Sequence, residues 1–97
     1  MEGEGMNIML DKCAETLCPR RMHPTDAGLD LRSPVGRTIF PLGSVEIDTG
    51  VHVELPHGTY GRIESKSGLF FKSGLITTGT IDEGYTGSIK IKLFTSL

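Results

Sequence analysis

The sequence has 97 residues, with ten Lys and Arg against twelve Asp and Glu and a formal net charge of −2. A balance so close to neutral gives no global field that would collect nucleic acid or anionic lipid, so any anion must be bound locally. A chain of this length forms one small domain, residues 1–97, which buries only about 60–65% of its unfolded surface. Because the apolar fraction is 37% and Trp is absent, we expect further burial between subunits, and hence an oligomer.

Targeting and cysteine signals are weak. No apolar run approaches the roughly 20 residues that a membrane-spanning helix needs, and residues 1–5 are acidic where a signal peptide is basic. We therefore expect a cytoplasmic protein with no membrane or nucleic-acid partner. Cys13 and Cys18 have no companion pair at zinc-finger spacing, so they are interpreted as reduced loop thiols. His23, His52 and His57 likewise lack metal-ligand spacing and are interpreted as loop or strand-surface residues.

In chain order, an extended connector over residues 11–25 precedes a series of short strands. Turn signals recur at residues 34–36, 41–43, 48–50, 56–58 and 82–84, each with Pro, Gly or both. Between them, residues 51–55 alternate apolar and polar side chains, and so do residues 89–93, with Ile89, Ile91 and Leu93 on one face. This pattern predicts an all-β sandwich or jelly roll.

One interval interrupts the alternation. Residues 65–74 predict a single helical turn that begins near Ser67 and ends at Gly74. At its start, the hydroxyls, the cation and the glycine of Ser65-Lys66-Ser67-Gly68 could present donors to a phosphate, although the same residues could simply cap the helix.

Two carboxylate-bearing segments are further candidates for chemistry. In residues 25–31, Asp30 could anchor a magnesium-bound phosphate chain, or the segment could be an Asx-type turn that enters a strand. Residues 79–87, GTIDEGYTG, predict a hairpin that carries Asp82 and Tyr85. An Asp held there could act as a general base and a Tyr ring could lie against a sugar, or the Asp could merely cap the turn.

These segments resemble a known family when they are taken together and in order. Residues 27–31 (AGLDL), 66–69 (KSGL) and 79–87 are similar to the first three sequence motifs of the dUTPases, and the likeness extends over residues 6–97. The resemblance implies an all-β, distorted jelly-roll or β-sandwich fold of the dUTPase-like (β-clip) type with one short helix. It also implies a homotrimer with active sites at subunit interfaces.

The implied activity is the hydrolysis of dUTP to dUMP and pyrophosphate with Mg²⁺. By resemblance, Asp82 activates the water that attacks the α-phosphorus, Tyr85 stacks under the deoxyribose, and Asp30 reaches the Mg²⁺ through water. Six residues would contact the rest of the nucleotide: the backbone of Gly79, Thr80 and Ile81 would pair with uracil, and Lys66, Ser67 and Gly68 would bind the phosphate chain.

Two departures from the family keep alternatives open. Lys66 stands where the family usually has Arg, which retains the charge and loses the bidentate fork. The family continues into a fourth and a fifth motif, and this chain, ending at Leu97, is expected to lack both. One alternative is therefore a non-catalytic nucleotide-binding or regulatory module. A second is a relative of dCTP deaminase, although Lys92 stands where that family places a catalytic Glu.

Overall fold

The computed structural model of the chain describes residues 2–3, 6–11, 18–21 and 23–96. It consists of strands and one helix, in the order β1 (Glu2–Gly3), β2 (Met6–Leu10), β3 (Ser44–Asp48), β4 (Val51–Glu54), β5 (Gly61–Glu64), α1 (Ser67–Ser73), β6 (Leu75–Ile76), β7 (Thr78–Ile81) and β8 (Lys90–Thr95). The prediction of an all-β chain with one short helix is confirmed.

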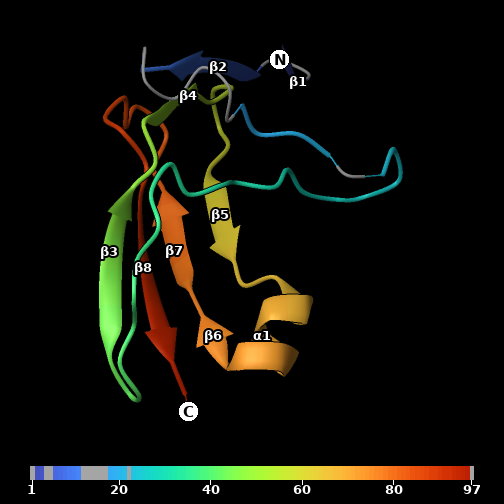
Figure 1. The fold of residues 1–97 in the computed structure, drawn as a ribbon. Helices are drawn as coiled ribbons and strands as arrows, with labels where there is room; N and C mark the ends of the chain where they lie inside the picture. Colours follow the sequence, from blue (N-terminus) through green and yellow to red (C-terminus); the bar gives the residue numbers. More distant parts are fainter. Residues whose placement is uncertain (1, 4–5, 12–17, 22, 97) are drawn as a thin grey trace.

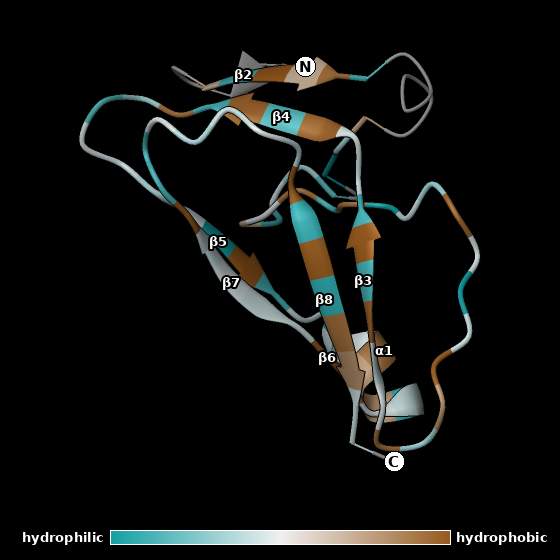
Figure 2. Cartoon of the chain, turned by 90° about the vertical axis from the view of Figure 1, so that its left-hand side faces the viewer, coloured by the Kyte–Doolittle hydropathy of each residue, from teal (hydrophilic) through white to brown (hydrophobic). Residues whose placement is uncertain are grey.

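The described strands form three antiparallel sheets, with the orders β1-β2-β4, β3-β8-β6 and β5-β7. The first sheet lies across one end of the molecule, and α1 lies at the other end (Figure 1). The β5-β7 ribbon and the β3-β8 pair converge near β6 and α1 and diverge towards the first sheet (Figure 2). Residues of β5, β7 and β8 line a cavity that belongs to the candidate site.

Strand β8 shows why these residues form strands. Its polar and apolar residues alternate, visible as bands in Figure 2, so one face packs inward and the other stays in solvent. Ile91 pairs with Ile47 and Leu93 pairs with Val45 across the β3-β8 ladder. Lys90 and Lys92 are exposed, so the predicted apolar inner face and basic outer face are confirmed.

The core lies where the first sheet meets the other two. Val51, Val53 and Ile89 are its most buried members, and eight half-buried apolar residues pack against them. The chain enters this core between β3 and β4, where Thr49 is only 2% exposed. Within residues 48–50, predicted as a turn, Thr49 and Gly50 form a buried crossing from one sheet to the next, and Asp48 stays exposed.

Helix α1 spans Ser67–Ser73 and ends at Gly74 in the left-handed conformation, as predicted, although it is longer than one turn. None of its residues is buried, and Leu69, Phe70 and Phe71 are 45%, 43% and 81% exposed. These apolar side chains form an exposed apolar surface on α1.

The connector predicted for residues 11–25 has no regular structure in its described part beyond an isolated bridge between Arg20 and Asp30. Cys18 is a free, half-buried thiol, and Cys13 lies outside the described residues. Among the residues described, no helix combines the length and the apolar character that crossing a bilayer would require.

Candidate nucleotide site

The predicted hairpin of residues 79–87 is not closed by strand pairing. Strand β6 pairs with β8 through Leu75↔Thr95 and Ile76↔Phe94, but β7 then turns away and pairs with β5 instead. Gly61 of β5 permits the close approach of β5 and β7. Any residue with a side chain would place its Cβ 3.0 Å from the Cβ of Ile81, which is too close. The hairpin prediction is therefore wrong in its strand pairing. The strand before the turn, β7, pairs with β5, and only the preceding strand, β6, pairs with β8.

A cavity of about 230 Å³ occupies the opening between β7 and β8. Its lining includes all the residues predicted for the nucleoside and the attacking water: Gly79, Thr80, Ile81, Asp82 and Tyr85. One edge of β7 pairs with β5, and in the described residues the other edge has no strand partner. An unpaired edge presents backbone N–H and C=O groups, which are the groups that can pair with the edge of a base.

Asp82 is the first residue of a tight turn and lines this cavity. The amide of Tyr85 donates to the carbonyl oxygen of Asp82 at 3.0 Å, and Gly84 has a φ of 89°. A positive φ at the third position of a turn is the reason for a glycine there. Within the part of the chain that the structure describes, the exposed Asp82 carboxylate has no hydrogen-bond or ion-pair partner, so it is available to a water molecule.

Tyr85 is held by its own loop. Its hydroxyl donates to the carbonyl oxygen of Ser88 at 2.8 Å, and the side chain is 45% exposed. A Cβ at Gly87 would lie 2.7 Å from the Tyr85 hydroxyl oxygen and 2.9 Å from Cζ, so glycine at this position lets the ring lie against the backbone. The ring is thus held in place beside a cavity that Tyr85 helps to line.

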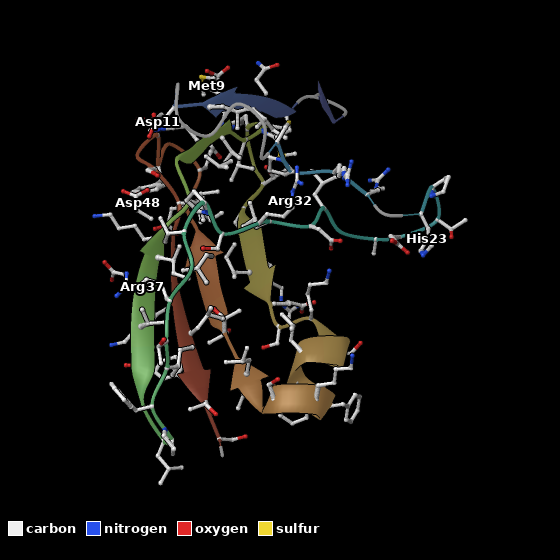
Figure 3. The ribbon with its side chains drawn as sticks, viewed as in Figure 1. Met9, Asp11, His23, Arg32, Arg37 and Asp48 are labelled. Carbon is white, nitrogen blue, oxygen red and sulfur yellow. The ribbon has the colours of Figure 1, made fainter. Side chains whose placement is uncertain are left out.

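The limb that follows Tyr85 is anchored to the buried crossing between β3 and β4. Ser88 donates to the Asp48 carboxylate and accepts from the amide of Gly50 at 3.0 Å. The hydrogen bond from Ser88, and next the one from Gly50, hold the pKa of Asp48 below its ordinary range. Asp48 and Asp11 lie at the end of the molecule away from α1 (Figure 3).

His52 of β4 makes the second anchor. Its Nδ1 lies 2.8 Å from the carbonyl oxygen of Thr86, and its Nε2 lies 2.8 Å from Asp11 Oδ1. Both partners accept, so the ring satisfies both only when each nitrogen carries a proton. The hydrogen bond to Thr86, followed by that to Asp11, raises the pKa of His52 above its ordinary value.

The residues predicted to bind phosphates and metal form a separate group. Asp30, Lys66, Ser67 and Gly68 line a second cavity of about 550 Å³. Lys66 Nζ donates to Asp30 Oδ2 at 3.1 Å, with side chains 56% and 27% exposed. Lys66 also precedes α1 without a side-chain cap. The predicted cation and the predicted metal-binding carboxylate therefore contact each other here.

Neither group reaches into the other's cavity. The linings share Ile63, Thr77 and Ile91, but none of the predicted phosphate residues lines the cavity of Asp82 and Tyr85. Thr77, between them, is held by Ser65, whose hydroxyl donates to its carbonyl oxygen at 2.9 Å and accepts from its amide at 2.8 Å. Ser65, which the sequence placed in the possible phosphate cradle, thus has a structural role.

The acidic residues fit a magnesium ion only in part. In the described residues there is no group of three or more His, Cys, Asp and Glu side chains that could hold a metal. Asp30 and Asp26 line the larger cavity. Mg²⁺ usually combines one or two carboxylates with waters and substrate phosphates. The donor set therefore fits an ion that arrives with a phosphate chain.

The fold and its two cavities define a small all-β protein of the jelly-roll class. The sequence model of the dUTPase family matches residues 14–96. The dUTPase of Staphylococcus bacteriophage 80alpha, in a structure with dUpNHpp, gives a TM-score of 0.85 at 35% identity and covers 95% of this chain and 54% of that chain. The dUTPase of phage phi11 gives 0.85 at 34% identity, covering 95% of this chain and 60% of that one.

Curated relatives found by sequence belong to the same family. The deoxyuridine 5'-triphosphate nucleotidohydrolase of Corynebacterium jeikeium is 45% identical over 89 residues, which is 89% of this chain and 56% of the relative. That of Rhodococcus erythropolis is 46% identical over 78 residues, 77% of this chain and 48% of the relative. The chain belongs to the dUTPase family. It spans about half the length of the curated relatives it matches.

The alternative of a relative of dCTP deaminase is disfavoured on two grounds. Family membership confirms the resemblance of the three ordered motifs and disfavours the deaminase. Lys92, at the position of that enzyme's catalytic Glu, is exposed on the outer face of β8, with Nζ 5.7 Å from the centroid of the Phe94 ring.

Three residues have structural roles that the sequence patterns did not indicate: Glu83, His57 and His52. All three make contacts between segments far apart in the chain. His23 is exposed and lies at the tip of a loop away from the strands (Figure 3), which agrees with its interpretation as a loop residue.

Proposed function

We propose that the chain hydrolyses dUTP to dUMP and pyrophosphate. Family membership supports this activity. The observation that carries it here is that the unpartnered carboxylate of Asp82, the ring of Tyr85 and the unpaired edge of β7 border one cavity. A base, a sugar and an attacked phosphorus need these three features side by side.

In the proposed reaction, Asp82 accepts a proton from the water as its oxygen attacks the α-phosphorus. The bond between that phosphorus and the oxygen bridging to the β-phosphorus breaks, and pyrophosphate leaves. No covalent intermediate is needed, since positioning and electrostatic stabilisation lower the barrier. The backbone of residues 79–81 pairs with uracil, and Tyr85 stacks under the deoxyribose and leaves no room for a 2′-hydroxyl.

Lys66, Ser67 and Gly68 bind the phosphate chain in this proposal, and Asp30 reaches Mg²⁺ through water. The ion, when bound, offsets the negative charge of the phosphates. A structure of a phage phi11 dUTPase variant describes a structural Mg(II) ion in that protein. Binding requires the Lys66–Asp30 contact to open, so that each side chain exchanges its partner for the ligand of opposite charge.

We also propose a homotrimer of single dUTPase-like domains, residues 1–97, in the cytoplasm. Two observations support assembly: the predicted site residues fall in two cavities, and large apolar side chains are exposed, among them Phe40 at 76%, Leu42 at 79% and Phe71 at 81%. Light scattering tests this proposal. A monomer at working concentration would remove the shared site.

The function is tested by pyrophosphate release from dUTP with Mg²⁺, with UTP and dCTP in parallel. Asp82→Asn is expected to slow release by about 10²–10⁴-fold, and Glu46→Gln, which alters an exposed carboxylate on β3, serves as the control. Equal rates for wild type and Asp82→Asn would refute the role of Asp82. Tight dUMP binding without pyrophosphate release would instead identify a nucleotide-binding module.

A further inference from the structure

The turn that carries Asp82 is fastened to a neighbouring loop by the next residue. Glu83 Oε1 accepts from the amide of Gly58 at 2.7 Å, and Glu83 Oε2 lies 3.0 Å from Nδ1 of His57. Each carboxylate oxygen thus has its own partner. Both partners belong to the loop between β4 and β5, 25 and 26 residues away in sequence.

That loop is itself well ordered by local bonds. The amide and the hydroxyl of Thr59 donate to the carbonyl oxygen of Pro56 at 3.2 and 2.6 Å, and Gly58 has a φ of 81°. The loop leads directly into β5, where Gly61 pairs with Ile81 at the end of β7. Glu83 therefore bonds to a frame whose position relative to β7 is fixed by the sheet.

The contact is one of few that hold the turn. In the described residues, the side chain of Asp82 bonds to nothing, Gly84 has no side chain, and Tyr85 bonds to Ser88 in the following limb. Without Glu83, the turn would be held to the β4-β5 side only through the backbone of β7. It could then pivot at Asp82.

The charge of Glu83 suits this contact. Its hydrogen bond with the Gly58 amide, and next that with His57, hold the pKa of Glu83 below its ordinary range. The side chain is therefore a carboxylate at neutral pH and can accept from both partners. A bond from a backbone amide to a carboxylate is stronger than one between neutral groups.

We propose that Glu83 is a positioning residue that fixes the direction of the Asp82 carboxylate by bonding the turn to the Pro56–Thr59 loop. This inference rests on the proposed function, because it assigns Glu83 a part in that reaction. Glu83 does not line the cavity of Asp82 and Tyr85. Its effect is to keep Asp82 within reach of the α-phosphorus.

The test compares Glu83→Ala with Glu83→Gln and with Glu54→Ala, a control that removes an exposed carboxylate bonded to Asn7 on β2. Because misplacing a reacting group by about 1 Å can cost up to about a hundredfold in rate, Glu83→Ala is expected to lower kcat for dUTP about tenfold or more and to change KM less than about threefold. Glu83→Gln should recover most of kcat, since its amide oxygen still accepts from Gly58.

A second readout needs no turnover. Hydrogen exchange at the amides of Gly58 and Tyr85, without nucleotide, should be faster in Glu83→Ala and unchanged in Glu54→Ala. If wild type turns over dUTP and Glu83→Ala matches it, the positioning role is refuted while the proposed function stands. If wild type releases no pyrophosphate, the proposed function fails, and unchanged exchange at both amides would then refute the fastening as well.

Discussion

The two halves of the candidate site are held in different ways. The nucleoside half, residues 79–89, is bonded on one flank by Glu83 and on the other by His52, Asp48 and the buried Thr49. The phosphate half depends on a helix with no buried residue and on one partly exposed ion pair, Lys66–Asp30. The nucleoside half therefore has more side-chain anchors within the chain than the phosphate half has.

This difference matches what the proposed function requires of each half. A base and a sugar are recognised by shape and by fixed hydrogen bonds, which benefit from a rigid surface formed before binding. A charged phosphate chain with its metal ion supplies its own ordering forces. An exposed ion pair contributes only about 0–1 kcal/mol, so exchanging Lys66–Asp30 for contacts with a ligand costs little.

The largest expected effect on stability is at Thr49, which joins the nucleoside half to the core. Its hydroxyl donates to the carbonyl oxygen of Ile89 at 2.7 Å and accepts from the amide of Val51 at 3.2 Å. Thr49→Val keeps the shape and removes the hydroxyl, so we expect the free energy of unfolding to fall by about 1–3 kcal/mol. Urea denaturation measures this, with the exposed Thr38→Val as the control, and an unchanged midpoint would contradict the anchoring role.

The next largest effect is expected at Gly87, where a substitution should change nucleotide binding more than stability. An Ala at position 87 would come within 2.7 Å of the Tyr85 hydroxyl oxygen and displace the ring. We expect Gly87→Ala to weaken dUMP binding by about 0.5–1.5 kcal/mol, the usual contribution of an aromatic stack, with a smaller change in unfolding. Calorimetry measures the affinity. Gly36→Ala, where an added Cβ meets nothing within 4 Å, is the control, and equal affinities would exclude the proposed stack.

A smaller structural effect is expected on the phosphate side. Lys66→Ala should change the free energy of unfolding by no more than about 1 kcal/mol because the ion pair is exposed. It should weaken binding of a non-hydrolysable dUTP analogue more than binding of dUMP, whereas Lys66→Arg should strengthen analogue binding through its bidentate fork. Lys72→Ala on the same helix is the control, and equal losses for both nucleotides would contradict the assignment to the phosphate chain.

The smallest expected effect is a dependence on pH through His52. Its folded pKa is raised, so its contribution to stability is complete below its ordinary pKa and is lost as the pH rises through the folded value. The Tm difference between wild type and His52→Gln should therefore be largest in mild acid and shrink in mild alkali. His23→Gln, in an exposed loop, is the control, and a pH-independent difference would show that His52 is not the titrating group.

Patterns local in sequence predicted much of this molecule. Alternation in residues 89–93 predicted β8, and Ser67 and Gly74 marked the ends of α1, because both signals act within a few residues. The choice of β5 over β8 as the partner of β7 was missed, since it depends on close packing at Gly61 against Ile81. Glu83 and His52 were missed for the same reason: their partners lie at least 25 residues away.

The most direct measurement is hydrolysis of dUTP with Mg²⁺ in water enriched in heavy oxygen, followed by mass spectrometry of both products. We predict the label in dUMP and none in pyrophosphate, because the water attacks the α-phosphorus. Asp82→Asn should be slower by about 10²–10⁴-fold, the usual contribution of a general base. Label in pyrophosphate, or an unchanged rate in Asp82→Asn, would contradict the central claim.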